Sequence, residues 1–235
     1  MLAERNQSSG FSRTFFLVWT GAIAVSVALC ALNLFRGEVN QDEGWYLYAA
    51  RLISQGKMPY VDFACTQGPV LPFVYVLVQP LVDHWGLVAG RLFTAFFGLL
   101  CSFAAAWLAA RLAPPGNRRF AALAAFCLAG INVYQSYFFT IVKTYALAGL
   151  LITMGFVLLS FMHSRRGTAA VFFSGVLIAL AAGTRISAGI VLPIVFIWLF
   201  VMGVKYSRSV ALRGLQFEAR QLRYVWLWFG IGAVF

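Results

Sequence analysis

Long apolar runs separated by short basic segments constrain the fold of this chain more than any other feature. The sequence has 235 residues, of which 62% are hydrophobic and only 11% are charged. Soluble globular domains carry about 25% charged residues, so this composition is typical of an integral membrane protein. A spanning helix needs about 20 apolar residues, and we therefore expect an all-α polytopic transmembrane helix bundle. The predicted spans cover residues 14–35, 88–110, 120–135, 138–162, 169–184, 187–204 and 225–235.

The first and last predicted spans indicate which part of a larger protein residues 1–235 form. The first span follows a polar, basic segment and lacks a small-residue cleavage site, which predicts an uncleaved signal anchor. The last span, 225–235, is too short to cross a bilayer. We therefore expect residues 1–235 to be the N-terminal part of one larger transmembrane domain and to be inactive alone.

Basic residues predict the orientation of the spans. In a soluble protein the net charge of +11 would suggest nucleic acid, but here most of the 18 Lys and Arg residues fall on one side of the predicted spans. The positive-inside rule makes that side cytoplasmic, so we expect a membrane and no nucleic acid as partner. The N-terminus is then cytoplasmic and the loop 36–87 is periplasmic or extracellular. The basic residues on the cytoplasmic side are Arg5, Arg13, Arg111, Arg118, Arg119, Arg165, Arg166, Lys205, Arg208, Arg213, Arg220 and Arg223.

The outer loop 36–87 carries two predicted interfacial helices. Asn40 and Glu43 have the spacing of a capping box. Apolar residues then recur at helical spacing until Gly56, which predicts a helix of about four turns lying in the interface, with Arg51 toward the headgroups. The second interfacial helix is expected over 69–82. The apolar face predicted for the first helix consists of Trp45, Tyr48, Ala49, Leu52 and Ile53.

The same loop holds most of the acids of the chain. There are seven carboxylates in all, and Asp42 and Glu43 form the only adjacent pair. One interpretation is that both simply cap the helix, because carboxylates are favoured at helix N-termini. The other is that one of them performs chemistry at the membrane surface, since one acid suffices for a cap. Two carboxylates do not define a metal site, so we predict no metal site and no cofactor, although such a pair could hold a divalent ion.

Three cations are predicted near the outer ends of spans: Arg91, Lys143 and Arg185. Charges within apolar segments are costly and usually have a partner or a task. They lie on the same side as the acids, where they could bind an anion such as a lipid phosphate. The alternative is that they anchor the spans at the headgroups.

Four short stretches of the chain form a recognisable series of motifs. They are Asp42-Glu43-Gly44-Trp45-Tyr46-Leu47-Tyr48-Ala49-Ala50-Arg51, Gly56-Lys57-Met58-Pro59-Tyr60-Val61-Asp62-Phe63, Gln67-Gly68-Pro69 and Gly90-Arg91-Leu92. Together they resemble the start of membrane glycosyltransferases of the GT-C superfamily, in the group of protein mannosyltransferases, aminoarabinose transferases and Rgt-like proteins. The resemblance is specific over 40–110 and topological beyond it, except at Thr184-Arg185, which is similar to a basic position in the fifth–sixth hairpin of relatives.

This resemblance implies a function and a site. In the family a sugar moves from a polyprenyl-phosphate donor to an acceptor hydroxyl with inversion, and the acceptor is a lipid, a glycan or a protein. It implies that Asp42 is the general base, that Glu43 orients the acceptor or the sugar, and that the outer loop is the catalytic loop in a bacterial inner (plasma) membrane. The residues implied for binding lipid phosphate or sugar are Arg91, Arg185, Lys143, Tyr46 and Gln67.

Two positions depart from the family pattern. Many relatives have Lys-Pro-Pro where this chain has Gln67-Gly68-Pro69, and an Asp where it has Lys143. The cationic phosphate contact is therefore missing or is supplied elsewhere. The competing functions are a transporter or flippase for lipid or solute, and a non-catalytic membrane subunit of the same fold. No internal repeat of the kind that transporters show is visible.

Overall fold

The computed structural model describes residues 2–164, 166–211 and 224–234, with side chains described over 13–164, 166–204 and 224–234. Within these residues every regular element is a helix, apart from one isolated bridge between Pro59 and Phe63. The prediction of an all-α fold is therefore confirmed. The helices are α1 (Leu2–Arg36), α2 (Gln41–Ser54), α3 (Val70–Val76), α4 (Gln79–Trp85), α5 (Leu87–Leu112), η1 (Pro115–Asn117), α6 (Arg118–Gly130), α7 (Val133–Phe138), α8 (Thr144–Leu159), α9 (Gly167–Thr184), η2 (Ile186–Ile190), α10 (Val191–Ala211) and α12 (Val225–Val234).

Four helical segments are long and apolar enough to cross a membrane. They are Arg13–Arg36, Leu87–Leu112, Gly167–Thr184 and Ile186–Val204. Their length and composition are those of a membrane protein. The helices α8 and α12 are equally apolar but shorter.

The spans predicted over 120–135 and 138–162 differ from the helices observed. The helix α6 ends at Gly130, and the side chain of Asn132 then accepts hydrogen bonds from the N–H groups of Tyr134 and Gln135. This N-cap starts a new short helix, α7. The next helix, α8, begins only at Thr144, so Lys143 lies in a non-helical segment rather than within a span.

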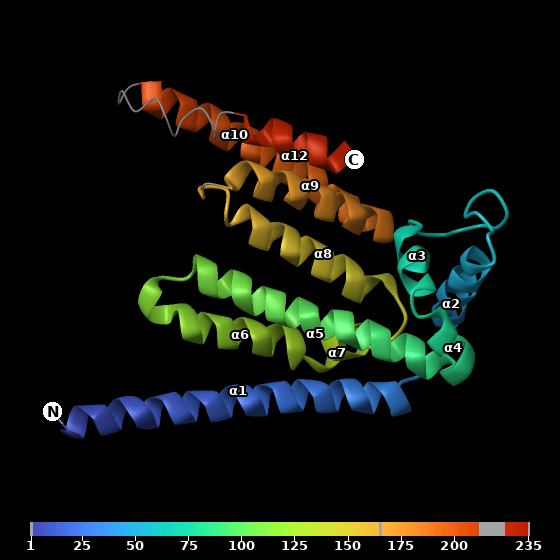
Figure 1. Ribbon diagram of the computed structural model, residues 1–235, viewed down its shortest axis with the longest axis horizontal. Coiled ribbons are helices and arrows are strands. Elements are labelled where there is room, and N and C mark those ends of the chain that lie inside the picture. Colours follow the sequence, from blue (N-terminus) through green and yellow to red (C-terminus); the bar gives the residue numbers. More distant parts are fainter. Residues whose placement is uncertain (1, 165, 212–223, 235) are drawn as a thin grey trace.

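The long helices lie side by side, and three short helices cover one end of the bundle (Figure 1). Along the bundle, α5 packs between α6 and α8, α9 packs on α8, and α12 packs on α9. A Cβ atom added at Gly175 of α9 would lie 2.3 Å from the carbonyl oxygen of Phe229, so the absence of a side chain lets α12 approach closely. We call the end that carries α2, α3 and α4 the α2 end.

The helix α2 has the ends that the sequence predicts. The side chain of Asn40 accepts the N–H of Asp42 at 3.1 Å, and Glu43 Oε2 accepts the N–H of Asn40 at 3.0 Å, which completes a capping box. Just beyond the helix, Gly56 adopts φ +82°, a conformation that glycine favours. Of the predicted apolar face, Ala49 is buried within the protein, whereas Trp45 and Tyr48 are 40% and 56% exposed. The buried residues of α2 are Glu43, Tyr46, Leu47, Ala49 and Ala50.

The segment predicted as one helix over 69–82 forms two short helices. The first, α3, ends at Val76, and α4 starts at Gln79 with Pro80 in its first turn. Proline has no N–H and its ring clashes with the carbonyl four residues earlier, here that of Val76. Pro80 therefore begins a helix rather than continuing one.

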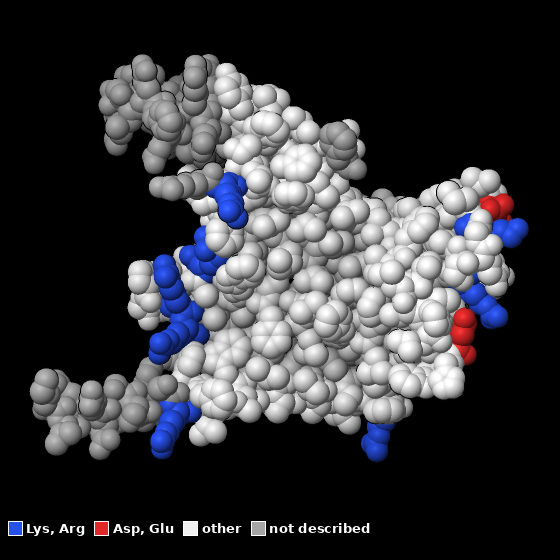
Figure 2. Space-filling view, viewed as in Figure 1, with Lys and Arg blue, Asp and Glu red and all other residues white. Residues whose placement is uncertain are grey.

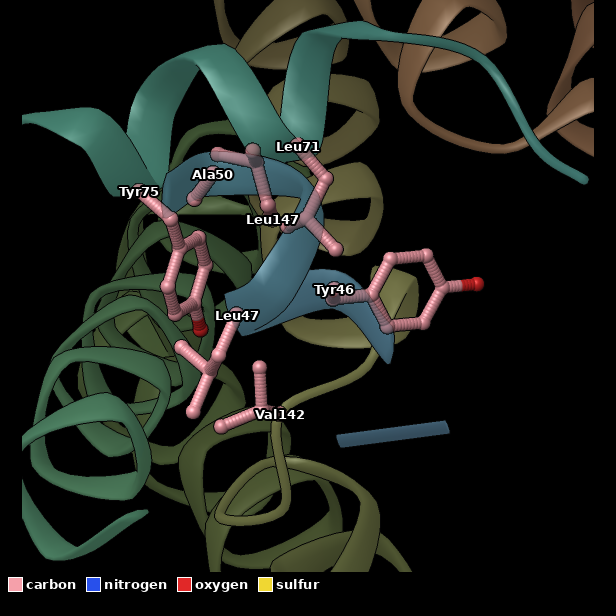
Figure 3. Close-up of a cluster of buried hydrophobic side chains, with 7 residues drawn as sticks. All are labelled: Tyr46, Leu47, Ala50, Leu71, Tyr75, Val142 and Leu147. Carbon is pink, nitrogen blue, oxygen red and sulfur yellow. The ribbon is translucent and has the colours of Figure 1, made fainter. Parts of the chain in front are cut away.

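A buried apolar cluster fixes α2 at its end of the bundle (Figure 3). It joins α2 to α3, to α8 and to the segment between α7 and α8. Asp42 lies on α2 and Lys143 directly follows Val142, so the packing of this cluster sets the relative position of these two residues. The cluster residues are Tyr46, Leu47, Ala50, Leu71, Tyr75, Val142 and Leu147.

Charge is distributed unevenly along the bundle (Figure 2). In this view Lys and Arg side chains gather mainly at the end opposite α2, whereas the acidic side chains in view lie at the α2 end. Among the basic residues used to predict the orientation, Arg165, Arg213, Arg220 and Arg223 lie outside the described residues, and the side chains of Arg5, Lys205 and Arg208 are not described.

Candidate functional site

The acids Asp42 and Glu43 are adjacent in sequence but have very different surroundings. The side chain of Glu43 is fully buried and forms a two-point ion pair with Arg91. Arg91 Nε donates to Oε1 at 2.9 Å, and Nη2 donates to Oε2 at 2.7 Å. The N–H of Val142 also donates to Oε1, at 3.0 Å. Together with the N–H of Asn40 on Oε2, these bonds engage both oxygens of Glu43.

The charge state of Glu43 follows from these contacts. Burial by itself raises the pKa of a carboxyl group, but the hydrogen bonds from Arg91, Asn40 and Val142 outweigh burial. They hold the pKa of Glu43 below its ordinary value. Glu43 is therefore a buried carboxylate that keeps its charge and has no oxygen free for a substrate.

Arg91 connects this carboxylate to the end of α1. Its Nη1 donates to the carbonyl oxygens of Asn33, Leu34 and Gly37 at 3.2, 3.3 and 3.1 Å, and its Nη2 donates to that of Glu38 at 2.9 Å. These carbonyls follow or close the last turn of α1, where backbone acceptors lack helical partners. Every guanidinium nitrogen of Arg91 is engaged within the protein. A lipid phosphate was predicted as the partner of Arg91, whereas in the structure Arg91 binds Glu43 and backbone oxygens.

Asp42 lies at the surface beside Lys143. Its Oδ2 is 3.0 Å from Lys143 Nζ, and the side chains are 47% and 16% exposed, respectively. Lys143 immediately precedes α8 and adopts an extended backbone, with φ −141° and ψ 168°. The two residues come from segments about one hundred positions apart, and the structure brings them together.

Arg185 is held next to Lys143 along α8. It follows the last residue of α9, and its guanidinium carbon lies 4.1 Å from the centre of the Tyr145 ring, in a cation–π contact. Its Nη1 donates to Thr144 Oγ1 at 3.1 Å, and its Nε donates to Ser187 Oγ at 2.9 Å. Because Thr144 follows Lys143 in the chain, the guanidinium of Arg185 is bound to the residue next to Lys143.

Tyr46 belongs to the same region. Its hydroxyl points away from the other side chains of the apolar cluster (Figure 3). Burial and then the negative charge of Asp42 raise its pKa, although Arg185 acts in the opposite direction. The phenol therefore keeps its proton and can donate a hydrogen bond.

The loop between α2 and α3 is attached to the end of α9. Gln67 Oε1 accepts the N–H of Ile186 at 3.3 Å, and the Gln67 carbonyl accepts the hydroxyl of Tyr60 at 2.6 Å. A Cβ atom added at Gly68 would lie 1.9 Å from the carbonyl oxygen of Gly183. Gln67 and Gly68 thus fix the loop beside Arg185.

The predicted site residues consequently fall into two groups. Glu43 and Arg91 form a buried pair, whereas the side chains of Asp42, Lys143 and Arg185 reach the surface of the α2 end. Thr144, Tyr145 and Ser187 were not predicted, although Thr144 and Tyr145 directly follow Lys143 at the start of an apolar run. Over the described residues, no three His, Cys, Asp or Glu side chains gather closely enough to hold a metal ion.

Comparison with other proteins adds no family. No family model matches the chain, and neither the curated proteins nor the solved structures give a significant match.

Proposed function

We propose that this chain belongs to a membrane glycosyltransferase of the GT-C type, which transfers a sugar from a polyprenyl-phosphate donor to an acceptor hydroxyl. The observation that carries the proposal is the surface carboxylate of Asp42, which pairs with Lys143, while Arg185 from another part of the chain binds Thr144, the residue after Lys143. A carboxylate can remove a proton, and cations can stabilise a phosphate leaving group. The resemblance of the motifs over 40–110 to that superfamily points to the same assignment, although no family model matches the chain.

The charge distribution supports an orientation for this enzyme. With the basic end of the bundle in the cytoplasm, the α2 end faces the periplasm or the cell exterior. The helices α2, α3 and α4 then lie at the outer interface of the bacterial inner membrane. The exposed aromatic side chains of Trp45 and Tyr48 suit that position, since such rings are enriched at membrane–water interfaces.

In the proposed reaction, Asp42 accepts the proton of the acceptor hydroxyl as that oxygen forms a bond to the anomeric carbon. The bond between this carbon and the phosphate oxygen breaks, and the electron pair stays on the lipid phosphate. Attack from the opposite side inverts the anomeric centre. Lys143 and Arg185 stabilise the charge that develops on the phosphate. The charges of Asp42 and Arg185 both affect the pKa of Tyr46, so this side chain belongs to the same site. Its hydroxyl can donate a hydrogen bond to the sugar or the phosphate.

Glu43 and Arg91 have a positioning role in this proposal. Their charges neutralise each other, and their hydrogen bonds join α1, α2, α5 and Val142. The pair therefore sets where Asp42 and Lys143 lie without contacting the substrate.

The test compares wild type, Asp42→Asn and Asp83→Asn, each expressed from the complete gene. Membranes receive labelled polyprenyl-phosphate sugars, and transfer of label to any acceptor is measured. Removal of a general base is expected to lower the rate by about 10²–10⁴-fold. Asp83 is a carboxylate of the same loop that pairs with Gln79, so Asp83→Asn should retain transfer.

Two results would contradict the proposal. Equal transfer by wild type and Asp42→Asn would remove Asp42 from the chemistry. Absence of transfer by the wild type from a broad donor panel would favour a flippase, a transporter or a non-catalytic subunit.

A further inference from the structure

Two neighbouring contacts join the same two segments of the chain. Glu43 accepts the N–H of Val142, and Asp42 pairs with the ammonium group of Lys143. The first contact is fully buried and is reinforced by Arg91. The second involves a carboxylate that is 47% exposed. The buried contact therefore holds the backbones together whether or not the exposed ion pair is formed.

The Asp42–Lys143 ion pair is partly exposed, since the two side chains are 47% and 16% exposed. Ion pairs at the protein surface are weak, with equilibrium constants of only about 1.4–5, so this pair can open. Lysine has a flexible stem and three donor hydrogens, so its ammonium can change partners without a backbone movement. Because Glu43 already fixes the backbone at Val142, the movement of Lys143 is confined to its side chain.

Arg185 is attached to the segment that begins with Lys143. Thr144, the next residue, binds Nη1 of Arg185, and Ser187 binds Nε. Within the described part of the chain, Nη2 of Arg185 has no hydrogen-bond partner. This arrangement leaves one edge of a positioned guanidinium for an anion, close to the turn that carries Lys143.

We propose that Asp42 and the phosphate of the donor compete for Lys143. Without donor, the ammonium is paired with Asp42; when a phosphate binds at Arg185, Lys143 turns to it and releases the carboxylate. Donor binding then increases the fraction of molecules in which the base is free. This inference rests on the proposed function, and it makes Lys143 the residue that links donor binding to the availability of Asp42.

The test is a double-mutant cycle on donor affinity rather than on turnover. Wild type, Asp42→Asn, Lys143→Gln and the double variant of the complete protein are titrated with farnesyl phosphate in detergent. Competition predicts that Asp42→Asn tightens binding by about 1.4–5-fold, the strength of the ion pair it removes. Lys143→Gln should weaken binding by about tenfold or more, because a charge-assisted hydrogen bond is lost. In the Lys143→Gln background, Asp42→Asn should add little.

The outcome that would overturn the inference is an equal gain from Asp42→Asn in both backgrounds, because simple repulsion between carboxylate and phosphate does not need Lys143. A set of Lys143→Arg variants keeps the cation, and there the gain from Asp42→Asn should return. If Lys143→Gln does not fold, absence of any gain from Asp42→Asn in the wild-type and Lys143→Arg backgrounds also overturns competition.

Two further ligands separate the sources of the signal. Farnesol lacks the phosphate, so coupling between Asp42 and Lys143 in its binding would contradict competition for an anion. Coupling with inorganic phosphate would support competition for the phosphate group itself. A wild type that transfers sugar but shows no coupling refutes this inference alone, whereas one that neither transfers sugar nor binds farnesyl phosphate removes the proposed function as well.

Discussion

Removal of the Arg91 guanidinium should destabilise the protein strongly. In Arg91→Met the side chain keeps much of its length but loses its charge and donors. Glu43 then remains fully buried, with only two backbone N–H groups as hydrogen-bond donors. Breaking a buried ion pair by removing one partner costs about 3–5 kcal/mol. The four carbonyl oxygens that Arg91 satisfies near the end of α1 lose a partner at the same time.

The loss can be measured as a shift in melting temperature. For chains of this size each kcal/mol corresponds to about 2–4 °C, so Arg91→Met should melt about 6–20 °C below the wild type. Cys30 and Cys101 are buried, so a thiol-reactive fluorophore reports the unfolding of the purified protein in detergent. The matched control is Arg51→Met, which removes an exposed arginine from α2 and should change stability by less than about 0.5 kcal/mol.

A second variant tests the other partner of the ion pair. Glu43→Gln keeps the shape of the side chain but leaves the buried Arg91 without its counter-charge, so it too should be clearly destabilised. If Arg91→Met melted within about 2 °C of the wild type, the ion pair would not hold α1, α2 and α5 together, and the positioning role assigned to it would be refuted.

The remaining predictions concern pH and two glycines. The pKa of Glu43 is lowered in the folded chain, so its contribution to stability is present above the unfolded value of about 4.3 and is lost as the pH falls through the folded pKa. The melting temperature should therefore decrease below about pH 4.3, and Glu43→Gln should remove that part of the decrease; identical acid limbs in both proteins would contradict the assignment. Gly68→Ala should lower the melting temperature, because its Cβ would lie 1.9 Å from a backbone oxygen, whereas Gly44→Ala, whose Cβ meets nothing within 4 Å, should raise stability by about 0.5–1 kcal/mol. Equal effects of the two alanines would show that the loop is not packed against Gly183.

Local signals explain what the sequence could predict about α2. Its first and last residues follow from Asn40, Glu43 and Gly56, because caps and positive-φ positions depend on residues within a few places of one another. The buried face could not be predicted in the same way. Glu43 points inward because Arg91, 48 residues later, lies there to neutralise it. Apolar periodicity alone therefore did not place Glu43 in the buried face of α2, whereas it did select Ala49, which is buried.

The candidate site, too, could be predicted only in part: its charged residues could be identified from the sequence, but their contacts could not. Residue types and positions identified Asp42, Lys143 and Arg185 as the charges worth considering, because charges are rare in such an apolar chain. Their partners depend on how distant segments pack, and this is not encoded in local spacing. The sequence predicted the capping box of Asn40 and Glu43 and left open whether the acidic pair does more than cap the helix. The structure gives the reciprocal capping contact to Glu43 and leaves Asp42 at the surface.

The Glu43–Arg91 pair also has a consequence for how the protein is made. A ribosome adds about 5–20 residues per second, so Arg91, 48 residues after Glu43, emerges about 2–10 s later. Val142, 99 residues after Glu43, follows after about 5–20 s in all. Until Arg91 has been synthesised, the carboxylate of Glu43 has neither partner and is most stable in water. The nascent α2 should therefore wait outside the apolar phase and take its final place only after α5 and the segment before α8 have been synthesised.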